Sequence, residues 1–206
     1  MKKTLFIDRD STILAEPANG LADSLEDFRF LPGAITSLSR IVKETDYELV
    51  MVTNQDGLGT EAFPEEMFWP SHNKMLQILK DEGVVFAEVF IDRTMPEEKA
   101  PTRKPGTAML TRYLAQGIDL ASSFVIGDRI TDLQMAQNLG CGAIYFNETL
   151  DALALFNTTD WNDIYCKISG GSPSISEVLF GYENALLIAG NDPTISEFKI
   201  TDFANV

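Results

Sequence analysis

The chain has 206 residues, of which 45% are hydrophobic and 23% are charged, as is ordinary for a globular protein with a substantial core. Its formal net charge of −15 argues against nucleic acid or an anionic membrane as the main partner. No apolar run approaches the ~20 residues that span a bilayer, and Asp8 interrupts the apolar N-terminus too early for a signal peptide. Two cysteines, Cys141 and Cys166, are too few for a disulfide framework, so we expect a cytoplasmic protein.

Residues 5–14 begin as a short apolar run that carries two aspartates, Asp8 and Asp10, at its end. Such a run suits a buried central strand whose carboxyl end opens into a crevice. Two carboxylates this close raise each other's cost of ionisation, and a divalent cation removes that cost. Mg²⁺ prefers one or two carboxylates together with water and phosphate oxygens. The stretch predicts a metal-assisted site, although a simple turn after a strand is also often rich in Asp and Ser.

A second strand follows after a loop and a helix. Residues 15–30 are polar and lack a clean period, which predicts a loop or flap beside the site. Apolar side chains at helical spacing follow Pro32, and residues 47–53 form another apolar run with a polar end. A strand, a helix and a strand in this order are the parts of a parallel βαβ unit.

The next segment predicts a loop, a helix and a strand. Residues 56–70 are rich in glycine, proline and aromatic residues, whose rings either close over a ligand or pack against the body. A helix is expected over residues 71–82, with Ser71 as its N-cap and Gly83 at its end. Residues 84–91 are expected to form the third strand.

The alternation continues to about residue 146. Residues 92–105 contain three prolines and predict an irregular segment. We expect helices over residues 106–116 and 133–139, and strands over residues 124–127 and 143–146. The pattern predicts an α/β fold with a doubly wound parallel sheet, in which ligands bind outside the carboxyl ends of the strands.

Four polar clusters at the ends of these expected elements carry the side chains that phosphoryl transfer requires. They are Asp8 with Asp10, Thr53 with Asn54, Lys104, and Asp128 with Asp132. One carboxylate can attack phosphorus, and a second can protonate the leaving oxygen and later activate water. A hydroxyl, an amide and a lysine can neutralise the equatorial oxygens, while a metal ion bridges phosphate and carboxylates.

The order Asp-x-Asp-x-Thr, Thr-Asn, Lys-Pro and Gly-Asp-x-x-x-Asp in these clusters resembles the haloacid-dehalogenase-type phosphatases. More narrowly, residues 49–60, 70–76 and 125–132 are similar to the histidinol-phosphatases, which often form the N-terminal half of a bifunctional histidine-biosynthesis protein. The resemblance covers roughly residues 1–150. It implies a Rossmann-like sheet of the haloacid-dehalogenase type with loop inserts in place of a large cap.

The resemblance also implies a role for each aspartate. Asp8 corresponds to the nucleophile, and Asp10 corresponds to the general acid and base. Asp8, the main-chain carbonyl of Asp10, and Asp128 correspond to the Mg²⁺ ligands, and Asp132 corresponds to a supporting acid.

The phosphate-binding residues that the resemblance implies are Thr53, Asn54 and Lys104. The expected activity is that of a Mg²⁺-dependent phosphomonoesterase with an aspartyl-phosphate intermediate. The expected partner is a small phosphorylated metabolite, with L-histidinol phosphate as the first candidate. A sugar-phosphate phosphatase of the heptose bisphosphate type and a non-catalytic binder of phosphorylated ligands are the alternatives.

Two positions depart from the family pattern. Ser11 stands where the family usually has glycine, a residue favoured where the backbone turns sharply. Close relatives carry a Cys/His zinc loop before the lysine, whereas residues 91–104 contain no Cys and no His here. Because zinc sites are built from such ligands, we expect no structural zinc, and the prolines of the segment are expected to restrict it instead.

His72 and the C-terminal part complete the sequence-based expectations. His72, the only histidine, lies at the start of a predicted helix and is expected to be structural rather than a catalytic base. The family likeness fades after residue 151, which predicts a phosphatase domain over 1–151 and a C-terminal part over 152–206. The latter is expected to hold a short helix containing Trp161 and two short strands, at residues 186–189 and 196–201.

Overall fold

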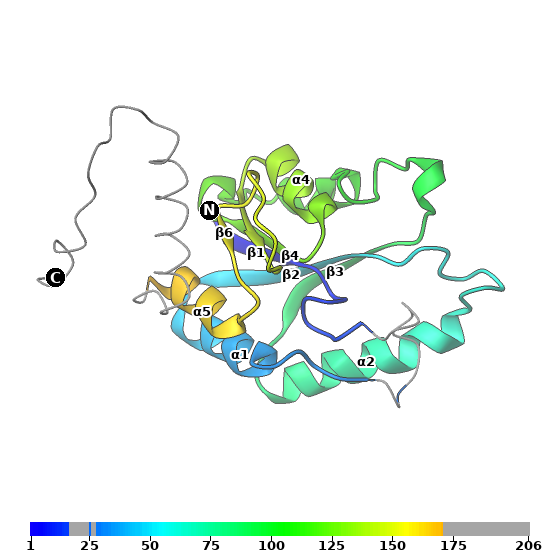
Figure 1. Cartoon of the computed structure of the whole chain (residues 1–206), viewed down its shortest axis with the longest axis horizontal. Helices are drawn as coiled ribbons and strands as arrows, with labels where there is room; N and C mark the ends of the chain where they lie inside the picture. Colours follow the sequence, from blue (N-terminus) through cyan, green and yellow to red (C-terminus); the bar gives the residue numbers. More distant parts are fainter. Residues whose placement is uncertain (17–24, 26–27, 171–206) are drawn as a thin grey trace, which may run out of the picture. The chain divides into compact units, whose positions relative to one another are not determined.

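The computed structural model describes residues 1–16, 25 and 28–170, and all statements on structure refer to these (Figure 1). A six-stranded, entirely parallel sheet has the order β3-β2-β1-β4-β5-β6. The strands are β1 (Lys3–Ile7), β2 (Tyr47–Asn54), β3 (Phe86–Asp92), β4 (Phe124–Gly127), β5 (Gly142–Tyr145) and β6 (Phe156–Asn157). The chain order runs one way from β1 to β3 and the other way from β4, so the topological switch point lies between β1 and β4.

Helices cover both faces of the sheet (Figure 1). They are α1 (Ala34–Glu44), α2 (Glu65–Asp81), α3 (Thr111–Leu114), α4 (Ile130–Leu139) and α5 (Trp161–Ser169), with 3₁₀ turns at Pro96–Glu98, Ala108–Leu110 and Leu120–Ser122. One core layer packs under α1, α2 and α5, and the other packs under α3 and α4. No helix within the described ranges combines the length and the apolarity that a membrane crossing requires.

β1 is the central strand, and its sequence explains why. Leu5 and Ile7 belong to the core layer under α1, while Phe6 belongs to the opposite layer, and all three are fully buried. A strand buried on both faces reads as a continuous apolar run and not as an alternating one. The predicted doubly wound parallel α/β fold is confirmed, and the expected fourth strand has the observed bounds.

The start of α2 differs from the sequence-based expectation. The helix begins at Glu65 and not at Ser71, so Pro70 lies inside it and Ser71 is a buried helical residue instead of an N-cap. An internal proline removes one helical hydrogen bond. Burial of Phe68, whose ring stacks on His72 one turn later at 4.8 Å, favours the longer helix. The aromatic residues of this segment therefore pack against the body of the protein.

The expected helix over residues 106–116 is also shorter than predicted. Only the 3₁₀ turn at Ala108–Leu110 and the single turn of α3 are helical. The amide of Gly106 donates to the carbonyl of Arg103 at 2.6 Å, and that of Ala108 donates to the carbonyl of Pro101 at 3.1 Å. In these bonds the amides of Gly106 and Ala108 donate to the preceding loop, so the helix begins later.

β6 and α5 lie beyond residue 151, yet they belong to the same compact unit, Met1–Gly171, as the rest of the sheet. Trp161 of α5 is fully buried, packs against Phe146, and donates its indole N–H to the carbonyl of Thr12 at 2.7 Å. α5 thus supports the loop that follows β1. The predicted division at residue 151 stays a prediction, and the strands expected at 186–189 and 196–201 lie outside the described residues.

The Trp161→Phe variant tests this support. It keeps an aromatic ring but leaves the buried carbonyl of Thr12 without its donor. An unpaired buried acceptor costs about 2 kcal/mol, so we expect the free energy of unfolding in urea to fall by that amount. Trp69→Phe is the matched control, because Trp69 donates to the half-exposed Glu65 carboxylate, which can turn to water. Equal losses in the two variants would contradict the support that we assign to α5.

Candidate active site

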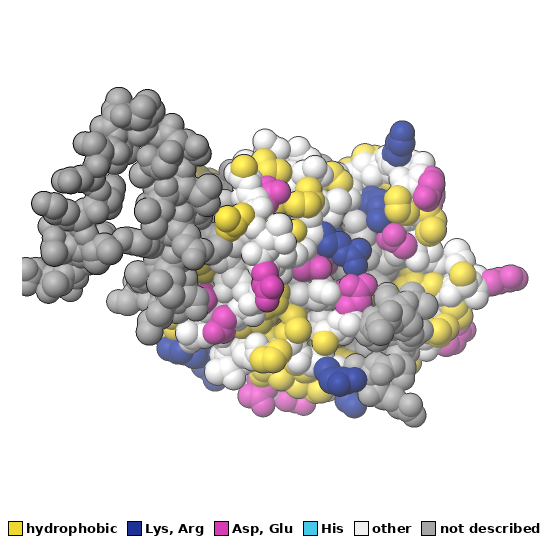
Figure 2. Space-filling view, viewed as in Figure 1, with side chains coloured by type: hydrophobic (Ala, Val, Ile, Leu, Met, Phe, Trp, Pro, Cys, Tyr) yellow, Lys and Arg dark blue, Asp and Glu magenta, His cyan; other side chains and the backbone are white. Residues whose placement is uncertain are grey.

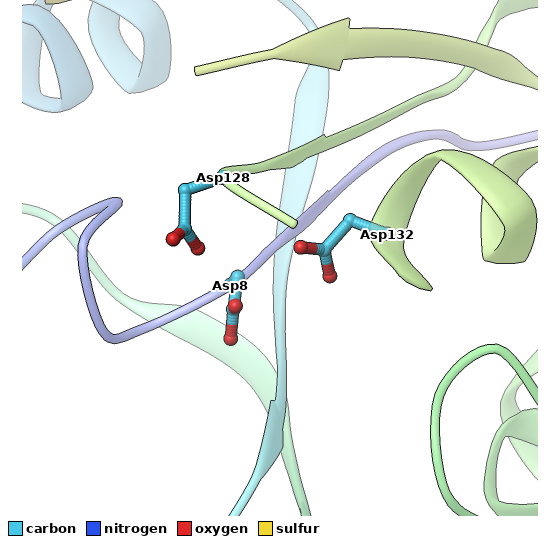
Figure 3. Close-up of side chains that lie close together, drawn as sticks. All are labelled: Asp8, Asp128 and Asp132. Atoms are coloured by element: carbon cyan, nitrogen blue, oxygen red, sulfur yellow. The ribbon is translucent and has the colours of Figure 1, made fainter. Parts of the chain in front are cut away.

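Three carboxylates converge at the ends of the two central strands (Figure 3). Asp8 follows β1, Asp128 follows β4, and Asp132 lies in the first turn of α4. The amide of Asp8 donates to the carbonyl of Ile126 at 2.9 Å, which continues the parallel pairing of β1 with β4 to the strand ends. One oxygen atom from each carboxylate lies within 4.8 Å of the other two.

This group of carboxylates has the properties of a cation site. Oδ1 of Asp128 is buried and has no hydrogen-bond partner among the described residues. The pKa of Asp128 is raised to about 7, mainly by burial and also by the negative charges of Asp8 and Asp132. A hard divalent cation would bind the unpartnered oxygen as one of its ligands and would compensate the excess negative charge. The residues present therefore fit Mg²⁺.

Lys104 balances part of this negative charge. Its side chain is 3% exposed, and Nζ lies 2.8 Å from Oδ1 of Asp8 and 2.7 Å from Oδ1 of Asp132. Burial lowers the pKa of Lys104, but the two carboxylates outweigh burial and raise it, so the ammonium stays charged. The Asn54 side chain clamps the backbone of Lys104, accepting from its amide at 3.0 Å and donating to its carbonyl at 3.3 Å.

Asp10 is oriented by two donors, one on each carboxylate oxygen. Nη1 of Arg9 donates to Oδ1 at 2.6 Å, and Nε2 of Gln55 donates to Oδ2 at 2.6 Å. Nε2 of Gln55 also donates to the hydroxyl oxygen of Thr53 at 2.9 Å, which leaves the Thr53 hydroxyl hydrogen available for another acceptor. The buried Arg9 guanidinium lies over the ring of Phe68. This network places an oriented carboxylate two residues after Asp8.

A pocket of about 170 Å³ opens beside these groups. Its lining residues are Asp8, Asp10, Asn54, Arg103, Lys104, Arg129, Ile130 and Thr131. Figure 2 shows acidic and basic side chains next to each other in the middle of the viewed face. Of the other predicted site residues, Asp132 touches the pocket-lining Lys104, and Thr53 bonds to Gln55. The structure therefore brings the four sequence clusters to one place.

Comparison with known proteins identifies relatives of this chain. A HAD-hydrolase-like family model matches residues 101–147. The histidine biosynthesis bifunctional protein HisB of Bacteroides fragilis is 51% identical over 173 residues, covering 79% of this chain and 46% of that protein. HisB of Spirosoma linguale is 48% identical over 183 residues, covering 80% of this chain and 48% of that protein. The chain spans about half the length of these curated relatives.

Solved structures share the fold. D,D-heptose 1,7-bisphosphate phosphatase from B. bronchiseptica, in complex with magnesium and phosphate, has a TM-score of 0.70 at 24% identity, covering 81% of this chain and 97% of that one. A HAD-like phosphatase from Mesorhizobium loti has a TM-score of 0.68 at 22% identity, covering 84% of this chain and 89% of that one. This chain contains a haloacid-dehalogenase-like phosphatase domain. The expected family and its Rossmann-like fold are thereby confirmed.

Ser11 shows why this family usually has glycine after the second aspartate. Its backbone is left-handed, with φ of 52°, a conformation that costs a residue with a side chain roughly 1–2 kcal/mol. The loop offsets this cost locally, because the amides of Ile13 and Leu14 both donate to the carbonyl of Arg9. The Ser11 hydroxyl also donates to Glu16 at 3.0 Å. Serine is therefore accommodated at this left-handed position of the loop.

Sequence reasoning missed two residues that hold the site. Gln55 directly follows the predicted Thr53-Asn54 pair, and continuing the strand by one residue would have included it. Arg103 pairs with Asp56, which lies 47 positions away, and no local pattern indicates that contact.

His72 belongs to the packing beneath the site and does not line the pocket. Its side chain stacks on Phe68 and contacts Trp69 edge-on, and the residue is only 2% exposed. The pKa of His72 is lowered to about 4, mainly by burial and also by the positive charge of Arg9. The imidazole is therefore neutral at physiological pH, which supports the expected structural role.

The low pKa of His72 predicts a loss of stability in acid. Between pH 6.5 and 4 the unfolded chain binds a proton at this position that the folded chain does not bind, so stability falls as the pH falls. We expect His72→Phe to remove about 2 kcal/mol of the loss in unfolding free energy between pH 7.5 and pH 5. Urea denaturation at the two pH values measures this difference. An acid-induced loss of the same size in the variant would show that the buried imidazole accepts a proton in the folded state.

Proposed function

We propose that this chain is a cytoplasmic, Mg²⁺-dependent phosphomonoesterase that works through an aspartyl-phosphate on Asp8. The observation that carries the chemistry is the convergence of Asp8, Lys104 and Asp128 beside one pocket. L-histidinol phosphate is the proposed substrate and L-histidinol the product. The identity of about 50% to proteins named for histidine biosynthesis supports this substrate.

The proposed cation site uses Asp8, the main-chain carbonyl of Asp10, and Asp128. When bound there, Mg²⁺ would neutralise charge on the phosphate and on the carboxylates. Asp132 has a different proposed role. Because its carboxylate bonds to Nζ of Lys104 at 2.7 Å, it holds the ammonium beside Asp8.

In the first proposed step, a carboxylate oxygen of Asp8 attacks phosphorus while the bond from phosphorus to the ester oxygen breaks. Asp10 gives its proton to the leaving oxygen, so the alcohol departs neutral. Lys104, the hydroxyl of Thr53 and the strand end at Asn54 stabilise the charge on the equatorial oxygens. The product of this step is an acyl phosphate on Asp8.

In the second proposed step, the ionised Asp10 takes a proton from water as the water oxygen attacks phosphorus. The bond between phosphorus and the Asp8 oxygen breaks, which releases inorganic phosphate and restores both carboxyl groups to their starting states. The orientation of Asp10 by Arg9 and Gln55 serves both steps, because the same carboxyl group must face the ester oxygen and then water.

A phosphoester panel with Mg²⁺ tests this function in the native protein and in Asp8→Asn. We expect the highest kcat/KM for L-histidinol phosphate, and a loss of roughly 10³-fold or more in the variant, which lacks the nucleophile. Asp81→Asn is the control, because it changes an exposed carboxylate on α2 by the same single charge. Preference for a heptose bisphosphate would replace the proposed substrate. Binding without turnover in both proteins would replace the proposed reaction.

Metal dependence is tested separately by chelation. Removing divalent cations is expected to abolish turnover, and added Mg²⁺ is expected to restore it, because the buried carboxylates need a counter-charge. Metal analysis of the purified protein is expected to find far less than one zinc ion per chain, since residues 91–104 provide no Cys or His ligand. A stoichiometric zinc content would contradict this prediction.

A further inference from the structure

The three cationic side chains that line the pocket are Arg103, Lys104 and Arg129. Each of them is already paired with at least one carboxylate. Lys104 bonds to Asp8 and Asp132 inside the proposed catalytic centre, so its charge belongs to the reacting phosphoryl group. The two arginines are therefore the cations that could meet the distal part of a substrate.

Arg103 is the more strongly engaged of the two arginines. Its Nη1 and Nη2 atoms bond to the two oxygens of Asp56, the second at 3.0 Å, and Nη1 also donates to the carbonyl of Thr94 at 2.8 Å. The Arg103 side chain is 15% exposed, whereas Asp56 does not line the pocket. Asp56 thus neutralises a pocket arginine from outside, in the bidentate geometry that a phosphate group would otherwise use.

Arg129 repeats the arrangement in weaker form. Its Nη2 donates to both oxygens of Glu16, at 3.1 and 3.2 Å. The Arg129 side chain is 55% exposed, so solvent screens this pair more than it screens the Arg103 pair. Glu16 neutralises the second arginine of the pocket, and its contribution is expected to be smaller.

We infer that Asp56, assisted by Glu16, determines specificity by directing the pocket toward esters with a single phosphate and a neutral or cationic distal part. This inference rests on the proposed function. A second phosphate carries about −1.5 to −2 charges at neutral pH, and it would meet arginines whose bidentate positions are occupied by carboxylates. Its binding requires that an existing ion pair be broken, whereas an amine or an imidazole at that end requires no such break.

The test measures competitive inhibition constants against p-nitrophenyl phosphate hydrolysis with Mg²⁺ present. The two inhibitors are fructose 6-phosphate and fructose 1,6-bisphosphate, which differ by one phosphate group. The quantity compared is the inhibition constant of the monophosphate divided by that of the bisphosphate. We expect this ratio to be about tenfold higher in Asp56→Asn than in the native protein, because Arg103 becomes available to the second phosphate. Asp81→Asn, with the same change in net charge, is expected to leave the ratio unchanged.

Two further variants identify which residues cause the change in the ratio. Adding Arg103→Gln to Asp56→Asn is expected to return the ratio to the native value, since the released guanidinium is then absent. Glu16→Gln is expected to shift the ratio in the same direction by about threefold. The shift is smaller than in Asp56→Asn because the pair of Glu16 with Arg129 is more exposed to solvent. This variant also tests the inference if Asp56→Asn does not fold. An unchanged ratio in the single variants, or a gain that persists in the double variant, would overturn the inference alone. Absence of p-nitrophenyl phosphate turnover would overturn the proposed function and the inference together.

Discussion

The buried contact of Lys104 with Asp8 and Asp132 is the constraint on which the site depends. A charge removed from water must be paired, and an unpaired one costs several kcal/mol. Three carboxylates face the Lys104 ammonium and, 3.9 Å from Asp128, the Arg129 guanidinium that also pairs with Glu16, so negative charge is in excess among the described residues. The fold therefore holds a place that favours a divalent cation and, with it, an anionic substrate.

This arrangement needs a rigid support, and the parallel sheet supplies it. Asp8 and Asp128 follow neighbouring strands whose hydrogen-bonded pairing extends to the aspartates themselves. Lys104 comes from an irregular loop, and the side chain of Asn54 at the end of β2 fixes its backbone. The end of β2 thus holds the main chain of the loop at Lys104, which positions the ammonium beside Asp8.

What could be predicted from the sequence follows from the same geometry. Carboxyl ends of parallel strands meet at one edge, so polar residues after apolar runs could be assigned to one site before their contacts were known. Contacts between distant segments were not predictable in this way. The indole of Trp161 reaches Thr12 across 149 positions, and Arg103 reaches Asp56 across 47. The start of α2 was misplaced because Pro70 is a strong local signal that burial of Phe68 overrides.

The site therefore divides into a centre and a rim that obey different physical rules. At the centre, charges are buried and paired, and the proposed reaction uses the same residue types for any phosphate ester. At the rim, ion pairs such as Arg103 with Asp56 are partly exposed, so changing one is expected to cost less stability than changing a pair at the centre. In the inferred mechanism of selectivity, phosphate esters are distinguished by which arginines at the rim are already paired with a carboxylate of the protein. A carboxylate outside the pocket can decide this without ever touching the substrate.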